Sequence, residues 1–287
     1  MSRPRSVTRT APAKINIVLR VAGLRPDGYH EIASLVVPIS LADTVTVSAA
    51  ASLEVEVTGD PSRTAEVPVG GLNLAIVAAL ALGATSGGRG AHIAIEKRIP
   101  SAAGLGGGSA DAAATLHALN ELWGCGLGAE DLAGIAERVG SDVPALTLGG
   151  PVIVGGRGEE LRRAVVAPFS WVLVHGERGV ASPEAYRWWD EDGGVAGPDI
   201  SAVLAAARAG DPAVLARHLR NDLEGPVVAR RPEIGAARDR LLAAGALAAI
   251  MSGSGSSVVG LARDAAHAAD IAAAIPGAEA VSSVGSG

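Results

Sequence analysis

The glycine-rich stretch PSAAGLGGGSADAAATLH, at residues 100–117, constrains the fold of this chain more than any other feature. Glycine loses more backbone freedom on folding than any other residue, so such a run weakens regular structure unless the fold uses it. Residues 92–97 before it alternate as a strand does, and apolar residues recur at helical spacing from Ala112 to Trp123 after it. This order of strand, glycine loop and helix is typical of a phosphate-binding site and argues against a flexible linker.

The chemistry of such a loop is simple. The unpaired N–H groups of the first helical turn point at an anion, and glycine lets the backbone approach closely. The stretch does not match the P-loop pattern, and Ser109 stands where a dinucleotide-binding loop needs its third glycine. A second Gly/Ser turn, MSGSGSS at residues 251–257, is compatible with either an anion-binding nest or a plain hairpin.

Composition narrows the class of protein. The 287 residues suggest one or two domains at roughly 150 residues each, and 48% hydrophobic residues suffice for a core. A net charge of −6 argues against a general nucleic-acid binder. The single cysteine, Cys125, excludes an internal disulfide framework, and the scattered histidines lack zinc-site spacing.

No targeting segment is evident either. The basic N-terminus lacks the apolar stretch of a signal peptide, and the most apolar window, residues 72–84, is shorter than the ~20 residues that cross a bilayer. We therefore expect a cytoplasmic protein that binds neither membrane nor nucleic acid.

Lys14 and Lys97 are the only lysines among 24 basic residues. Arginine does not readily replace the compact ammonium of lysine, so both positions are candidates for a functional role.

Strand and helix patterns mix along the chain without a strict βα alternation, so we predict an α+β protein with two domains. We place the first domain at residues 1–160 and the second at residues 161–287. Ile15, Ile17 and Leu19 alternate as a strand that places Lys14 and Asn16 on its other face.

Three segments together resemble the motifs of the GHMP kinases: APAKINIVL at residues 11–19, PSAAGLGGGSADAAA at residues 100–114, and MSGSGSS. The additional pieces RPDGYHEI, GSDVP and NDLEGP resemble the branch of that superfamily that phosphorylates the 2-hydroxyl of CDP-methylerythritol with ATP in the non-mevalonate isoprenoid pathway. The resemblance covers about residues 10–262. It implies an N-terminal domain like that of ribosomal protein S5, a ferredoxin-like C-terminal domain, and ligands bound in the cleft between them.

The resemblance also implies a role for each matching residue. It makes Lys14 and Asp142 the catalytic pair. The substrate-binding positions that it implies are Asn16, Tyr29, His30, Ser182 and Tyr186, of which the two tyrosines sandwich cytosine and the histidine reads the cytosine edge. The ATP-binding positions that it implies are Asn73, Leu74, Lys97, Pro100, Gly104, Leu105, Gly106, Gly107, Gly108, Ser109 and Ala110. The loop that supports the phosphates from the second domain is then Gly253, Ser254 and Gly255.

Phosphoryl transfer depends mainly on positioning and charge neutralisation. Lys14 can neutralise the γ-phosphate, and Asp142 can accept or orient the hydroxyl proton. We expect Mg²⁺ to arrive with ATP and to keep mostly water and phosphate ligands, with no protein ligand assigned. The residues themselves leave alternatives open: an exposed strand lysine, a helix-capping aspartate, and tyrosines that belong to a core.

The whole chain also has alternative functions. It could be a homoserine or mevalonate type of small-alcohol kinase, or a catalytically inactive nucleotide-binding module. The motif RPDGYH and the paired tyrosines argue against the first, and the retained lysine, aspartate and glycine loop argue against the second. The sequence assigns no role to Trp188, Trp189, Asn221 or Asp222.

Overall fold

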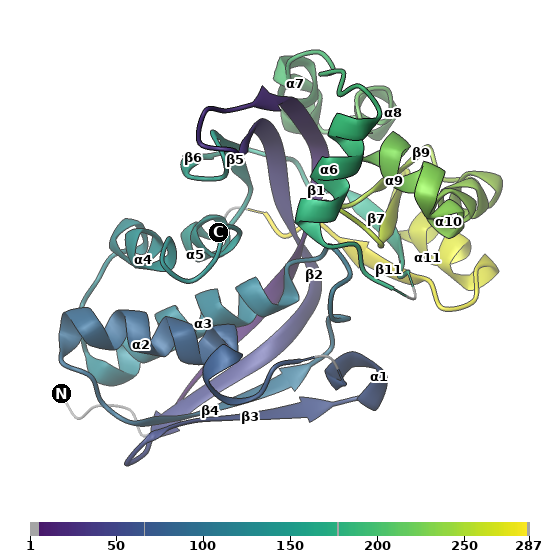
Figure 1. The fold of residues 1–287 in the computed structure, drawn as a ribbon. Helices are drawn as coiled ribbons and strands as arrows, with labels where there is room; N and C mark the ends of the chain where they lie inside the picture. Colours follow the sequence, from purple (N-terminus) through teal and green to yellow (C-terminus); the bar gives the residue numbers. More distant parts are fainter. Residues whose placement is uncertain (1–5, 66, 177, 286–287) are drawn as a thin grey trace. The chain divides into compact units, whose positions relative to one another are not determined.

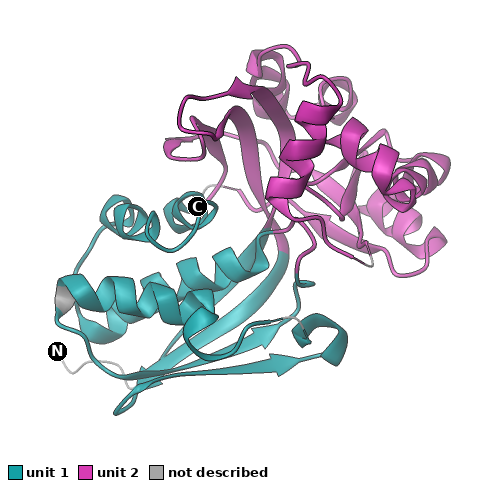
Figure 2. Cartoon of the chain, in the orientation of Figure 1, with its two compact units in different colours: residues 1–13, 41–101, 106–149 teal, residues 14–40, 102–105, 150–287 magenta. Residues whose placement is uncertain are grey.

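The computed structural model describes residues 6–285 apart from residues 66 and 177, and it divides into two compact units (Figures 1 and 2). Unit 1 comprises residues 1–13, 41–101 and 106–149, and unit 2 comprises residues 14–40, 102–105 and 150–287. Two long strands, β1 (Ser6–Leu24) and β2 (His30–Ala49), contribute residues to both units. The predicted boundary after residue 160 stays a prediction.

Unit 1 contains a sheet in which the end of β2, β4 (Ala91–Lys97) and β3 (Leu53–Gly59) are neighbours. β4 runs antiparallel to β2 and parallel to β3. The alternation seen in the sequence sets which side is buried: Ile93 and Ile95 lie opposite Val47 and Val45 of β2, and all four are buried.

Helices cover this sheet on its buried side (Figure 1). The core joins the inward faces of α2 (Leu74–Ser86) and α3 (Gly107–Trp123) to the strand side chains. Alanine-rich faces let these two helices approach each other closely. The shorter helices of the unit are α1 (Pro61–Thr64), η1 (Gly70–Leu72), α4 (Ala129–Ala136) and α5 (Val143–Leu148).

Unit 2 contains the remaining parts of β1 and β2. The short strand β8 (Arg220–Asn221) pairs in parallel with β1, while β5 (Val152–Gly155) pairs with β2 and with β6 (Glu160–Arg163). The turn between β1 and β2 contains Gly28, which has a φ of +83° and whose N–H donates to the Arg25 carbonyl at 3.0 Å.

The second sheet of unit 2 has four antiparallel strands in the order β11-β7-β10-β9. α10 packs against β9 and β10, and α11 packs against β7 and β11, which gives the ferredoxin-like order βαββαβ. These elements are β7 (Ser170–Val174), α10 (Pro232–Ala243), β9 (Ala248–Met251), β10 (Val258–Leu261), α11 (Ala265–Ala274) and β11 (Glu279–Ser282). The remaining helices are α6 (Ser182–Glu191), α7 (Ser201–Ala209), α8 (Pro212–Ala216) and α9 (Glu224–Arg230).

The α+β prediction is confirmed. The sequence patterns predicted neither α1, α5, α6 nor α9, and they indicated β1 only around its alternating core. In the described part of the chain, no helix combines the length and the apolar character that crossing a membrane requires.

Candidate active site

The helix predicted after the glycine loop begins at Gly107, and Gly106 caps it with a φ of +68°. The first helical hydrogen bond runs from the Ala110 N–H to the Gly106 carbonyl. The N–H groups of Gly107, Gly108 and Ser109 therefore precede the helical hydrogen-bond ladder, as an anion site requires. The assignment of Gly106–Ala110 to the ATP-binding positions stays a prediction.

Other predicted ATP-binding residues of unit 1 lie beside this helix start. The Leu74 side chain lies beside Gly108. A Cβ atom built on Gly108 would lie 3.6 Å from the Cδ1 atom of Leu74. Asn73 caps α2: its Oδ1 accepts from the Ala75 N–H at 2.9 Å, and its Nδ2 donates to the Pro68 carbonyl at 2.9 Å. Its side chain thus has a structural role of its own.

Lys97 is buried below the helix start, and its ammonium lies 3.4 Å from the position of a Cβ on Gly107. It donates to Asp43 and, at 2.7 Å, to Asp111 of α3. Asp43 also accepts the Arg98 N–H at 2.5 Å and the Ile99 N–H at 2.8 Å. The cluster therefore ties the end of β4 and the start of α3 to β2.

The cluster contains one ammonium and two carboxylates, which perturbs its protonation. Burial raises the pKa of Asp111 to about 7; the nearby Lys97 charge opposes this rise and Asp43 reinforces it. For Lys97, burial acts to lower the pKa, but the two carboxylates outweigh it and the pKa is raised. Lys97 therefore stays charged, and Asp111 binds a proton more readily than an ordinary aspartate does.

Asp142 is exposed at the start of α5, and its side chain makes no capping hydrogen bond to that helix. The alternative role as a helix cap therefore does not hold. Pro100 lies in the segment between β4 and α3, half-buried.

In unit 2, Lys14 is buried, with 5% of the residue exposed, which rules out an ordinary exposed strand lysine. Its Nζ donates to the Asn16 Oδ1 at 2.9 Å and to the Gly104 carbonyl at 3.0 Å. The Asn16 Nδ2 in turn donates to the Ser34 hydroxyl at 2.8 Å. The alternation of β1 thus brings the two predicted residues into contact and aims both at the glycine loop.

The same loop packs on the second Gly/Ser turn. The Ser257 N–H donates to the Ala103 carbonyl at 3.1 Å, and the Lys14 N–H donates to the Leu105 carbonyl at 2.9 Å. A Cβ on Gly104 would lie 2.5 Å from the Ser252 carbonyl oxygen, and Gly104 has a φ of +75°. This close approach of two backbones explains why glycine is needed there.

Gly253 continues this arrangement, because a Cβ on it would lie 3.2 Å from the Lys14 Nζ and 3.4 Å from the Asn16 Oδ1. The Ser254 hydroxyl donates to the Val180 carbonyl at 3.0 Å and lies 3.3 Å from the Ser182 hydroxyl. Lys14, Asn16, Ser182 and the 253–255 turn are therefore brought together. The turn joins the antiparallel strands β9 and β10 as a hairpin does, and its role as a phosphate-supporting loop stays a prediction.

The predicted cytosine-binding residues are only partly assembled. His30 stacks on Tyr186, with ring centroids 4.9 Å apart and an interplanar angle of 20°. Tyr29 is 57% exposed, which rules out a core residue, and the Arg157 guanidinium lies over its ring at 5.1 Å. The structure thus pairs Tyr186 with His30 and pairs Tyr29 with Arg157.

Sequence reasoning missed the support of the 251–257 turn. The buried Asn221 donates through Nδ2 to the Met251 carbonyl at 2.8 Å and to the Gly253 carbonyl at 2.7 Å. Asp222 accepts the N–H groups of Val21, at 2.9 Å, and of Gly197, at 3.0 Å. The motif NDLEGP, which begins with these two residues, was the available signal, but only the fold shows which carbonyls the Asn221 amide reaches.

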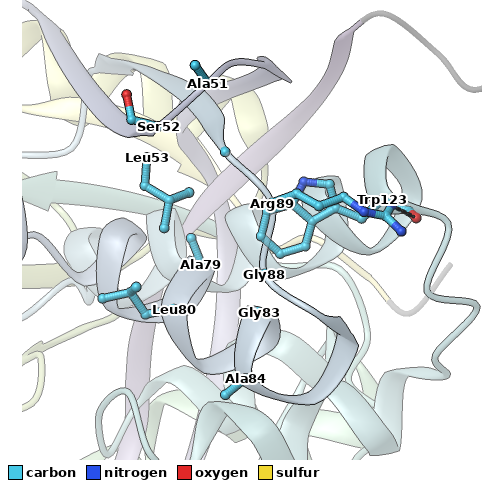
Figure 3. Close-up of a pocket in the computed structure, with 11 residues that line it drawn as sticks. Ala51, Ser52, Leu53, Ala79, Leu80, Gly83, Ala84, Gly88, Arg89 and Trp123 are labelled. Atoms are coloured by element: carbon cyan, nitrogen blue, oxygen red, sulfur yellow. Dashed lines mark hydrogen bonds between the residues drawn. The ribbon is translucent and has the colours of Figure 1, made fainter.

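A hollow of about 390 Å³ opens in unit 1 between the start of β3 and the ends of α2 and α3 (Figure 3). Leu53, Leu80, Arg89 and Trp123 are among its lining residues. It includes no predicted site residue. Among the described residues, no group of three or more His, Cys, Asp or Glu side chains could hold a metal ion.

Comparison with known proteins identifies the family of the chain. Residues 73–150 match the GHMP kinases N terminal domain, and residues 203–280 match the GHMP kinases C terminal domain. The 4-diphosphocytidyl-2-C-methyl-D-erythritol kinase of Leifsonia xyli subsp. xyli (strain CTCB07) is 40% identical over 93% of this chain and 92% of its own length.

Solved structures give the same result. A crystal structure of 4-(cytidine 5'-diphospho)-2C-methyl-D-erythritol kinase has a TM-score of 0.81 and 37% identity, covering 97% of this chain and 100% of that one. A homoserine kinase from Cytophaga hutchinsonii ATCC 33406 has a TM-score of 0.72 at 22% identity, covering 99% and 96%. The latter likeness concerns the fold alone. The two-domain α+β architecture predicted from the sequence motifs is confirmed.

Proposed function

This chain belongs to the GHMP kinases, and within them to the 4-diphosphocytidyl-2-C-methyl-D-erythritol kinases, and we propose that it catalyses the reaction for which those relatives are named. ATP would phosphorylate the 2-hydroxyl of CDP-methylerythritol and leave as ADP. The observation that carries the proposal is the buried Lys14 Nζ, fixed 2.9 Å from Asn16 and 3.0 Å from the carbonyl of Gly104 in the glycine loop.

In the proposed reaction the 2-hydroxyl oxygen attacks the γ-phosphorus, and the bond from that phosphorus to the bridging oxygen of ADP breaks. The hydroxyl proton goes to the carboxylate of Asp142, and the Lys14 ammonium neutralises the transferred phosphoryl group. Both acts reduce the charge that develops during transfer, which is the main task of a protein in phosphoryl transfer.

In the proposed reaction, the nucleotide binds at the start of α3. Its free N–H groups at Gly107, Gly108 and Ser109 would hold phosphate oxygens, and Gly253–Gly255 would support the phosphates from unit 2. Mg²⁺ accompanying ATP would supply further charge neutralisation through phosphate and water oxygens. Asn73 and Leu74 would border the adenine, and the ion-paired Lys97 would act by holding the helix start in place.

A substrate panel tests the proposal. The protein should release ADP with CDP-methylerythritol, and it should be far less active with homoserine or mevalonate. Asp142→Asn should lower kcat by about 10²–10⁴-fold, the usual range for a lost general base, while ATP still binds in calorimetry. Activity on homoserine or mevalonate alone would reject the substrate, and an unchanged kcat would remove Asp142 from the mechanism.

A further inference from the structure

Helix α6 surrounds the ring of His30 with three side chains. Tyr186, Trp189 and Asp190 are spaced i, i+3 and i+4, which places them on one face of the helix. Tyr186 stacks on the imidazole, and Trp189 meets it edge-on with centroids 5.7 Å apart and planes at 90°. Only 10% of the His30 side chain stays exposed, so its ring is held in one orientation.

The third side chain sets the hydrogen-bonding character of that ring. The His30 Nε2 lies 2.9 Å from the Asp190 Oδ1. An ionised carboxylate only accepts hydrogen bonds, so Nε2 must carry the proton in this pair. In the neutral imidazole the other nitrogen, Nδ1, is then an acceptor. Across the described residues, Nδ1 has no hydrogen-bond partner within the protein.

Cytosine and uracil differ at the position that such an acceptor can read. Cytosine presents an exocyclic amine that donates a hydrogen bond, whereas uracil presents a carbonyl oxygen that accepts one. An acceptor held in place favours the amine and leaves the carbonyl without a donor. A site built to hydrogen-bond one group rejects an analogue that lacks it, because the buried polar atoms are then unpaired.

We propose that Asp190 is a specificity-determining positioning residue that fixes His30 as the Nε2–H tautomer, so that Nδ1 selects a cytidine over a uridine nucleotide. The proposal rests on the proposed function and on the predicted role of His30, which the family resemblance implies reads the cytosine edge. Asp190 acts through the imidazole and does not itself contact the substrate. Trp189, to which the sequence assigned no role, then helps to hold the His30 ring by packing edge-on against it.

The neighbouring carboxylates supply a matched control. Asp192 lies directly after the last residue of α6. Its carboxylate accepts hydrogen bonds from the two terminal guanidinium nitrogens of Arg230, each at 2.9 Å. Asp192→Ala therefore removes a carboxylate from the same part of the molecule without touching His30. An exposed ion pair of this kind contributes little to stability, so this variant should keep its fold and its nucleobase preference.

The first measurement is independent of turnover. Long-range ¹⁵N–¹H correlation spectra of the ¹⁵N-histidine-labelled free protein, with His30→Gln for assignment, report which ring nitrogen carries the proton. We expect the Nε2–H form in the wild type and in Asp192→Ala, and an altered His30 ring environment in Asp190→Ala. A proton on Nδ1 in the wild type would overturn the proposal.

The second measurement compares CDP-methylerythritol with its uridine counterpart as phosphoryl acceptors. Asp190→Ala should raise KM for the cytidine substrate by about tenfold, the value of one good hydrogen bond, and lower the ratio of kcat/KM values by a similar factor, with KM for ATP unchanged. An unchanged ratio would overturn the proposal. If the wild type phosphorylated neither nucleotide, the proposed function would fail, while the spectra would still report the tautomer.

Discussion

At the scale of single residues, this protein depends on polar side chains that hold other groups in place. Asn221 is the clearest case, since its one amide binds two carbonyls of the 251–257 turn and accepts the Leu223 N–H at 3.0 Å. Removing a buried amide leaves its partners unsatisfied, at a cost of about 1–3 kcal/mol for a group. The turn that faces Lys14 would lose its support.

Asn221→Ala should therefore destabilise the protein and also raise KM for ATP or lower kcat, by roughly tenfold for 1.4 kcal/mol. Asn120→Ala is the matched control, because the Asn120 amide also binds a loop backbone, at the Leu127 carbonyl and N–H, away from the predicted site residues. Denaturant unfolding and steady-state kinetics on both variants separate the effects. Equal kinetic losses in the two variants would contradict a specific role for Asn221.

At the scale of elements, the glycine loop shows which structural features local sequence patterns predict and which they do not. Strand β4 and helix α3 follow from alternation and helical spacing alone. What the pattern does not show is that Ala102–Leu105 packs against the 251–257 turn, since the two are far apart in the sequence. Ala102 adopts a φ of +53°, an unusual backbone for a residue with a side chain, which marks the loop as strained.

Gly104→Ala tests that packing. The new Cβ would lie 2.5 and 2.9 Å from two carbonyl oxygens, so we expect lower stability and weaker ATP binding. Gly126→Ala is the control for backbone strain alone, because Gly126 has a similar φ of +71° but nothing lies within 4 Å of its Cβ position. Gly126→Ala should lower the free energy of unfolding by only about 1–2 kcal/mol, the cost of a left-handed backbone for a residue with a side chain. Thermal unfolding and calorimetry with ATP measure both, and equal losses would rule out the close approach.

At the scale of the whole molecule, stability should depend on pH through the Lys97–Asp43–Asp111 cluster. The pKa of Asp111 is raised to about 7 in the folded protein, whereas an aspartate in an unfolded chain has a pKa near ~3.9. The folded state therefore holds a proton that the unfolded state releases. Stability from this group is fully present below about pH 4 and is lost as the pH rises through about 7.

Asp111→Asn removes this titration and keeps an oxygen that can accept from Lys97. The wild-type free energy of unfolding should fall relative to this variant between about pH 4 and pH 7, by at most about 1.4 kcal/mol per pH unit. Above pH 7 the two curves should run parallel. Urea unfolding at several pH values measures the difference, and curves that are parallel over the whole range would show that Asp111 is ionised in the fold.

The sequence by itself determined the α+β class, the glycine loop between a strand and a helix, and the family, because local periodicity and contiguous motifs carry that information. It also identified Lys14 and Asn16 as neighbours on one strand face. Only the tertiary structure decided that Asn221 supports the second turn, that Lys97 lies between two carboxylates, and that Asp190 holds His30. Each of these contacts joins residues distant in the chain, so no local pattern records it, and burial and hydrogen bonding appear only once the chain has packed.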